Sequence, residues 1–390
     1  MKNAWQTKPV GELLLPQTTI NPLSFPEKRF SYIDVSSVSP KTFAIQEAQN
    51  LLGKDAPSRA RKLVQTNDVI FATIRPTLKR VALIPSEFDG QVCSTGYVVL
   101  RPTSVLHPSY LFYWLFTKNF SQQMAALQRG ASYPAVSDAD VRRQPISFPS
   151  RTEQERIVTI LDKAFAGIAR AKANTEHSLR KVLEAYDSFL ETHVTKGGEG
   201  WTNALFKDVC SIANGSQPPK STFRKEASDG YVRLIQIRDY KSDDHTVYIS
   251  KQHARSTCDV DDVMIGRYGP PVFQILRGLS GAYNVALMKA VPNERKVSKD
   301  FLFYFLNGRS LRNLIVSQSE RASGQTGVRK ELLEDYPFAY PDLKKQKQIV
   351  QSLFEMQESC QRLERILKNK LSALEELRQS LLYQAFSGSL

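Results

Sequence analysis

Two stretches decide the fold: PSRTEQERIVTIL at residues 149–161 and PDLKKQKQIVQSL at residues 341–353. An ungapped offset of 192 residues superimposes them, so that Pro, Gln, Ile, Val and Leu recur at matching places. The same offset aligns 129–161 with 321–353 at eight identical positions, which are Arg129, Val136, Pro145, Pro149, Gln154, Ile157, Val158 and Leu161 in the first copy. A repeat of this kind indicates one structural plan written twice.

Weaker matches continue the repeat upstream. The run YLFYWL at 110–115 corresponds to FLFYFL at 301–306, the triplet Asp-Val-Ile at 68–70 to Asp-Val-Met at 262–264, and Trp5 to Trp201. Short β-branched and aromatic runs at 68–74, 95–100 and 231–237 are broken by Pro and Gly, which is typical of strands. Each half therefore predicts a mixed α/β globular domain.

Each half should end in a long helix. The first begins after Pro149, with Ser150 as N-cap and Glu153 completing a capping box, and stops at Gly197-Gly198. The second follows Pro341, with Asp342 as N-cap. Apolar residues spaced by three and four predict a seam in each helix. The seams are Leu161, Phe165, Ile168, Thr175, Leu179, Val182, Tyr186, Phe189, and Leu353, Met356, Cys360, Leu363, Leu367, Leu374, Leu377, Leu381, with Lys172 and Lys370 in the weak slots.

Two such seams favour an antiparallel coiled coil, in which each rod of about 40 residues is roughly 60 Å long. In the alternative, each helix packs only on its own domain. We predict an α+β fold in which two mixed α/β domains, at 1–149 and 197–341, are separated by two long antiparallel coiled-coil helices, at 150–196 and 342–390, in a pseudo-twofold internal repeat.

The charge of the chain points to a polyanionic partner. The formal net charge is +14, and residues 1–150 and 197–342 carry +7 and +3 of it. Nucleic acid and an anionic membrane surface both fit this excess. The longest apolar run, 110–116, is far shorter than the roughly 20 residues that span a bilayer, so we expect no membrane association and a cytoplasmic protein.

Candidate polyanion contacts lie in both globular regions. Arg and Lys neutralise phosphates, Arg, Gln and Ser also read base edges, and glycines let the backbone approach closely. Any one of these residues could equally be a solvated surface group. The candidates are Arg75, Lys79, Arg80, Arg129, Ser132 and Tyr133 in the first half, and Lys220, Arg224, Lys225, Arg267, Tyr268, Gln325 and Thr326 in the second.

Catalytic and metal-binding motifs are missing from the sequence. Pro218-Pro219 and Pro270-Pro271 follow Gln217 and Gly269, so neither pair fits the Asn/Asp-Pro-Pro-aromatic site of an adenine methyltransferase. There is no GxxxxGK[ST] loop, GxSxG elbow or HExxH site. The four cysteines are far apart and have no metal-ligand spacing, so we expect reduced thiols and no catalytic residue.

The duplicated plan resembles the specificity subunit of type I restriction-modification enzymes over nearly the whole chain. The resemblance rests on 149–158, 341–350 and the terminal LRQSLLYQAFSG at 377–388. It implies two target recognition domains that each read one half of a split double-stranded DNA site. It also implies helices that act as a spacer and dock two methyltransferase subunits, with restriction subunits joining them. S-adenosylmethionine, ATP and Mg²⁺ would then bind to the partner subunits, and no cofactor to this chain.

Two other classes are open to this sequence. A coiled-coil architectural protein would bind DNA without specificity, and a self-sufficient methyltransferase or nuclease would carry its own active site. Competition with scrambled duplexes separates the first, and methyl transfer by the purified chain alone would support the second.

Overall fold

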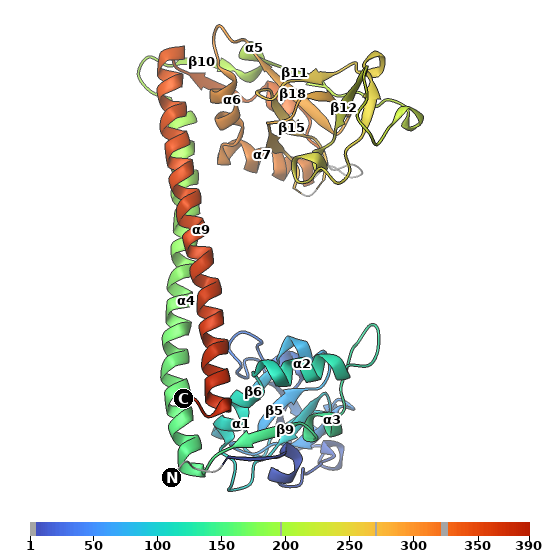
Figure 1. Cartoon of the computed structure of the whole chain (residues 1–390), viewed down its shortest axis with the longest axis vertical. Helices are drawn as coiled ribbons and strands as arrows, with labels where there is room; N and C mark the ends of the chain where they lie inside the picture. The colour runs from blue at the N-terminus through green and yellow to red at the C-terminus, as the bar shows by residue number, and fades with distance from the viewer. Residues whose placement is uncertain (1–4, 196, 270, 321–326) are drawn as a thin grey trace. The chain divides into compact units, whose positions relative to one another are not determined.

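The computed structural model describes residues 5–195, 197–269, 271–320 and 327–390. The chain forms two compact units, Met1–Thr175 with Asn369–Leu390 (unit 1) and Glu176–Lys368 (unit 2). Figure 1 shows that each unit contains a mixed α/β globular part and a stretch of each long helix. The predicted α+β class with an internal repeat is therefore confirmed.

Unit 1 is built on two small sheets and a closing strand pair. The first sheet has the order β3 (Gln49–Leu52), β2 (Arg29–Ile33), β7 (Val92–Ser94), β4 (Ala60–Leu63), and the second β6 (Val81–Leu83), β5 (Val69–Ala72), β8 (Tyr97–Leu100). Strand β1 (Gln6–Pro9) pairs with β9 (Pro145–Phe148). The helices are α1 (Pro108–Trp114), α2 (Lys118–Leu127) and α3 (Asp138–Arg142).

Unit 2 repeats this plan. Its sheets have the orders β13 (Tyr248–Ser250), β12 (Tyr231–Ile235), β17 (Gly281–Tyr283), β14 (Thr257–Cys258), and β11 (Cys210–Asn214), β18 (Leu287–Pro292), β15 (Val263–Gly266), β16 (Gln274–Leu276). Strand β10 (Thr202–Leu205) pairs with β19 (Pro337–Tyr340). The helices are α5 (Phe206–Val209), α6 (Lys299–Leu306), α7 (Arg309–Glu320) and α8 (Lys330–Glu334).

The strand pairings match between the units even where the sequences do not. The central pair is parallel in both, β2 with β7 and β12 with β17, and its neighbours are antiparallel. Strand β11 of unit 2 has only an isolated bridge between Leu14 and Pro102 as its counterpart in unit 1. The duplication is therefore one of topology.

The two long helices are α4 (Arg151–Val194) and α9 (Leu343–Ser387), close to the predicted bounds. In unit 1 the buried core joins Leu161 of α4 to Leu382 and Ala385 of α9. In unit 2 it joins Leu190 to Leu353. Within each unit the two helices therefore run antiparallel (Figure 1), and the predicted coiled-coil pairing is confirmed there.

The predicted seam of α9 needs three corrections. Leu363 and Leu377 are 47% and 49% exposed, and Lys370, predicted for the weak slot, is exposed as well, so these three residues do not lie in the seam. A regular alternation of four and three residues from Cys360 instead turns the neighbouring side chains inward, and these are Glu364, Leu367, Leu371, Leu374 and Arg378. The prediction followed the leucines, whereas the helical period places a glutamate and an arginine at seam positions.

The repeated glutamine fastens each long helix to its own domain. Gln154 accepts a hydrogen bond from the amide of His107 (2.8 Å) and donates to the carbonyls of Val105 and Pro149, both at 3.0 Å. Gln346 accepts from the amide of Ser298 (2.9 Å) and donates to the carbonyls of Lys296 (2.7 Å) and Pro341 (2.8 Å). Both glutamines are fully buried, so these bonds satisfy polar groups that water cannot reach. This accounts for the Pro-to-Gln spacing in both halves.

Candidate nucleic-acid interface

In unit 1 the end of strand β5 meets the loop that follows α2. The amide of Val136 donates to the carbonyl of Thr73 (2.9 Å), and the amide of Arg75 donates to the carbonyl of Pro134 (2.7 Å). Arg129 and Ala135 exchange two backbone hydrogen bonds across the base of the loop, and Gly130 has φ +96°. These contacts hold 129–135 as a short hairpin against the strand end, which we name the reading junction of unit 1.

Arg75 and Tyr133 form an exposed stack at this junction. The guanidinium carbon of Arg75 lies 4.9 Å from the ring centre of Tyr133, and Nη2 donates to the carbonyl of Ser132 at 3.5 Å. Tyr133 is 71% exposed, and Ser132 is exposed beside it. A cation held over an aromatic face keeps its remaining donors available to an incoming polyanion. The geometry thus brings together three of the predicted contacts.

Lys79 and Arg80 point elsewhere than the Arg75–Tyr133 stack. Arg80 Nη1 donates to the carbonyls of Val35 (3.2 Å), Ser36 (3.2 Å) and Val38 (2.5 Å). Burial lowers the pKa of Lys79, and so does the nearby charge of Arg378. Arg80 therefore supports a neighbouring loop, and Lys79 lies against α9. Their predicted contact with DNA stays a prediction.

Arg129 is the remaining candidate of unit 1. Its guanidinium lies 3.8 Å from the carboxylate of Asp140, and its side chain is 77% exposed. An exposed ion pair at this distance contributes little and is easily exchanged for a phosphate. Arg129 is therefore free to contact a ligand at the base of the hairpin.

Unit 2 has a reading junction at the equivalent place. The amide of Val328 donates to the carbonyl of Arg267 (3.0 Å), and Tyr268 forms an isolated bridge with Gly327. A Cβ atom on Gly327 would lie 2.9 Å from the ring of Tyr268, so any larger residue at this position would require the ring to move. Arg267 lies over the ring of Tyr268 at 5.3 Å. Gln325 and Thr326, which the sequence predicts here, lie outside the described residues.

The other candidates of unit 2 lie around strand β12. The backbones of Arg224 and Tyr248 pair through two hydrogen bonds, of 2.9 and 2.8 Å, and the Arg224 guanidinium lies 4.4 Å from the ring centre of Tyr231. Residues 224–228 line a shallow hollow of about 370 Å³, and Lys225 is among them. Lys220 is exposed on a 3-10 turn, Lys220–Thr222. Sequence reasoning missed Tyr231, because only the folded backbone brings it next to Arg224.

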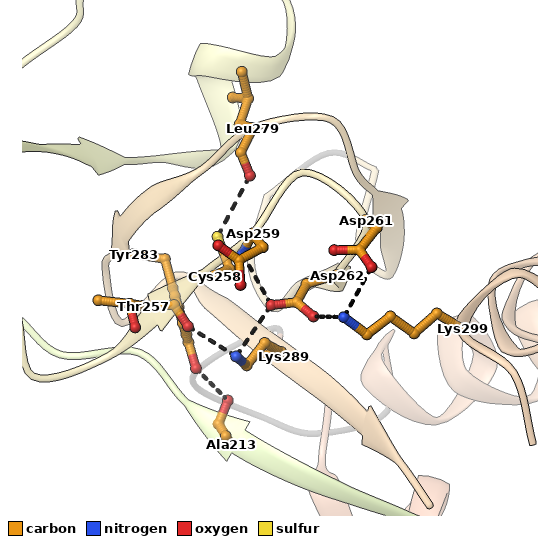
Figure 2. Close-up of polar contacts among 10 residues, drawn as sticks. All are labelled: Ala213, Thr257, Cys258, Asp259, Asp261, Asp262, Leu279, Tyr283, Lys289 and Lys299. Carbon is orange, nitrogen blue, oxygen red and sulfur yellow. Dashed lines mark hydrogen bonds and ion pairs between the residues drawn. The ribbon is translucent and has the colours of Figure 1, made fainter. Parts of the chain in front are cut away.

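A cluster of carboxylates and lysines in unit 2 needs separate consideration, because such groups can form a nuclease centre. Figure 2 shows Asp262 between Lys289 and Lys299. One carboxylate oxygen accepts from Lys289 (3.1 Å) and from the amide of Asp259 (2.9 Å), and the other lies 2.7 Å from Lys299. Burial alone would raise the pKa of Asp262, but the hydrogen bonds from both lysines outweigh it and lower that pKa.

Every oxygen of the Asp262 carboxylate is thus engaged by this chain. Asp261 pairs with Lys299 at 3.0 Å, and Lys289 also donates to the carbonyl of Thr257 (2.9 Å) (Figure 2). Asp262, which directly precedes β15, is therefore bound to strand β18 through Lys289 and to helix α6 through Lys299, and Lys289 extends the junction to β14. Among the described residues, no group of three His, Cys, Asp or Glu side chains is arranged to hold a metal ion. The cluster is a structural junction.

In the part of the chain that the structure describes, no helix is long and apolar enough to cross a bilayer.

The family model of the type I restriction modification DNA specificity domain matches residues 31–177 and again 198–373. These two matches cover both reading junctions and most of both long helices.

The chain belongs to this family, the specificity subunits of type I restriction-modification systems. Among its relatives is the StySPI specificity subunit of Salmonella potsdam, 23% identical over 76% of this chain and 69% of that protein. The HindI specificity subunit of Haemophilus influenzae is 26% identical over 33% of this chain, and the alignment spans 28% of that protein. The resemblance seen in the sequence is confirmed.

Solved specificity subunits have the same fold. A chain from a structural study of complex assembly and conformational transition of the type I R-M system matches with a TM-score of 0.87 and 28% identity, covering 99% of this chain and 98% of that one. The HsdS subunit from Thermoanaerobacter tengcongensis matches with a TM-score of 0.65 and 28% identity, covering 99% and 97%.

Proposed function

We propose that this specificity subunit recognises a bipartite double-stranded DNA site, with one half-site read at the reading junction of each unit. The observation that carries the proposal is the recurrence of one arrangement in both units. A strand end meets a glycine-containing loop, and an arginine stacks on a tyrosine beside that contact. Arginine in such a position can contact phosphate and read the acceptors of guanine in the major groove.

The charge distribution supports the same assignment. Residues 1–150 and 197–342 carry +7 and +3 of the net +14. Another arginine–tyrosine stack of unit 2, Arg224 with Tyr231, adds a second basic contact there. Since the sequence around the two junctions differs, we expect the two half-sites to differ as well.

The catalytic steps belong to partner subunits in this proposal. The chain docks two methyltransferase subunits and restriction subunits, which bind S-adenosylmethionine, ATP and Mg²⁺, and the complex acts on cytoplasmic DNA. The engaged Asp262 cluster supports a non-catalytic chain, because both of its carboxylate oxygens already have partners. Methyl transfer by the purified chain alone would contradict this assignment.

Competition binding tests the function directly. Sequencing of methylated bases in a host with and without the gene identifies the site. The chain with its methyltransferase subunits is then bound to a labelled duplex and challenged with duplexes in which one half-site or both are scrambled. We expect the intact site to bind about 10³-fold or more tightly than the fully scrambled duplex, as specific complexes do. Equal competition by all duplexes would show an architectural protein without specificity.

A further inference from the structure

Arg378 of α9 lies among three aromatic rings inside unit 1. Its guanidinium carbon is 5.1 Å from the ring centre of Phe43, 5.3 Å from that of Phe116 and 5.4 Å from that of Phe165. The side chain is 20% exposed, and its nearest carboxylate, Glu375, is 4.0 Å away. Burial lowers the pKa of Arg378. A cation has thus been placed where water reaches it poorly.

The three rings come from three separate parts of unit 1. Phe165 belongs to α4, Phe116 follows α1, and Phe43 belongs to the loop that leaves strand β2. Phe43 packs edge-on against Phe116 with their centres 4.5 Å apart. The hydroxyl of Tyr113, on α1, also donates to Asp162 of α4. Arg378 therefore connects the helix pair to the globular part of unit 1.

Phe43 leads from this cluster toward the reading junction. It has φ +55°, a conformation that a bulky residue adopts only where its surroundings enforce it. Its loop is closed by a bridge between Val38 and Ile45, and Arg80 donates to the carbonyl of Val38. Arg80 directly follows the short turn Pro76–Leu78, which is capped by Arg75 and Lys79. Side-chain contacts thus lead from Arg378 to Arg80, and the backbone of this turn joins Arg80 to the Arg75–Tyr133 stack.

Arg378 occupies a seam position of α9, where an apolar residue is usual. A leucine there would fill the heptad without the cost of burying a charge. The repeat offset of 192 places Tyr186, a neutral residue, at the matching position of unit 2. The aromatic cluster around a cation is thus a property of unit 1, whose loop carries Phe43.

We propose that Arg378 is a positioning residue for DNA reading by unit 1, acting through Phe43 and the loop 38–45. The proposal rests on the function proposed above, because it concerns the half-site that unit 1 reads. Arg378 sets the place of the loop, and the loop sets the place of Arg75 through Arg80. The residue does not itself touch DNA.

The test uses the complete chain with its methyltransferase subunits and measures discrimination at each half-site separately. The half-site of unit 1 is the one whose discrimination falls when Tyr133→Ala is introduced. We expect Arg378→Met to reduce discrimination at that half-site about tenfold, which corresponds to about 1.4 kcal/mol, and to leave the other half-site unchanged. Arg378→Lys should recover only part of the loss, since it keeps the charge but not the planar stacking.

Two further variants keep the test decisive. Lys370→Met removes one exposed positive charge from the same stretch of α9 and should change neither half-site. Phe43→Leu keeps an apolar side chain but removes the ring, and should reproduce the selective loss even if Arg378→Met fails to fold. An equal loss at both half-sites, or no loss at either, would overturn the positioning role. Absence of discrimination in the unaltered complex would instead overturn the proposed function.

Discussion

Units 1 and 2 share their framework contacts more closely than their reading surfaces. Gln154 and Gln346 make the same three hydrogen bonds to equivalent backbone groups. Asp68 and Asp262 both accept the amide of the residue three positions earlier, at 2.8 and 2.9 Å. At the reading junctions, by contrast, Arg75 stacks on a tyrosine of the hairpin, whereas Arg267 stacks on its own neighbour.

The partners of the two aspartates show how a framework contact can be kept while its chemistry changes. Arg101 binds Asp68 through two hydrogen bonds, of 2.8 and 2.7 Å, and the hydrogen bond to Asp68 raises the pKa of Arg101. In unit 2, Lys289 and Lys299 share that task. A buried carboxylate needs compensation, but either one forked cation or two point charges can supply it. Both units therefore keep the hydrogen bond from a backbone amide to the aspartate, whereas the cation that neutralises the carboxylate differs.

We expect the largest loss of stability when the Asp262 junction is broken. Asp262→Asn leaves the partly buried Lys289 without a charged partner and Lys299 with only the exposed Asp261, and it should lower the free energy of unfolding by about 3 kcal/mol at pH 7. Chemical denaturation measures the change. Asp261→Asn removes a 64% exposed partner of Lys299 and should cost about 0.5 kcal/mol or less. Equal losses for the two variants would contradict the central place of Asp262.

The stabilisation provided by Asp262 should depend on pH. The pKa of Asp262 in the folded unit lies below its ordinary 3.8, so its carboxylate stabilises the fold above that pH. That contribution is lost as the pH falls through the folded pKa. We expect the difference between the unaltered chain and Asp262→Asn to be constant near neutrality and to shrink below about pH 4. A difference that persists unchanged in acid would refute the pKa assignment.

Replacing Gln154 or Gln346 should cause the next largest loss of stability, and a similar one in both units. Gln154→Leu and Gln346→Leu each leave one buried amide and two carbonyls without their partner, at a cost of about 2 kcal/mol. Hydrogen exchange at the amides of His107 and Ser298 should increase only in the altered unit. Gln351→Leu, on the exposed face of α9, is the matched control and should change neither amide.

A smaller loss of stability should distinguish Arg80 of unit 1 from Gln274, its counterpart in unit 2. Arg80→Met leaves three carbonyls of the 35–38 segment unsatisfied by the side chain and should cost about 1 kcal/mol. The offset of 194 that aligns Asp68 with Asp262 places Gln274 at the matching position, and the side-chain amide of Gln274 donates to the nearby carbonyl of Pro271 (3.0 Å). We expect Gln274→Met to have almost no effect in the same denaturation experiment. A larger loss for Gln274→Met would reverse this distinction between the units.

The smallest effect concerns the salt dependence of DNA binding. Arg75→Gln should reduce the slope of log affinity against log salt by about 0.9, the value for one lost phosphate contact. Lys79→Gln should leave the slope unchanged, because Lys79 lies against α9. Titrations at several salt concentrations measure both. A change of slope for Lys79→Gln and none for Arg75→Gln would assign the phosphate contact to Lys79 instead.

The sequence predicted most of the architecture because its signals were local or periodic. The repeat, the helix after Pro149 and the N-cap at Asp342, whose carboxylate accepts the amide of Lys345 (2.8 Å), were all found. The carbonyl partners of Arg80 and the aromatic partners of Arg378 could not be found from the sequence, because they lie far away in the chain. The seam was assigned to Leu377 by residue type, and only the helical register shows that Arg378 faces inward.

The order in which the chain is made has a consequence for its assembly. Unit 2 is one continuous segment, whereas the core of unit 1 includes Leu382 and Ala385, which are synthesised after all of unit 2. Because domains fold as units during synthesis, unit 2 can complete its core first. Unit 1 can complete its core only after Leu382 and Ala385 of α9 have been synthesised.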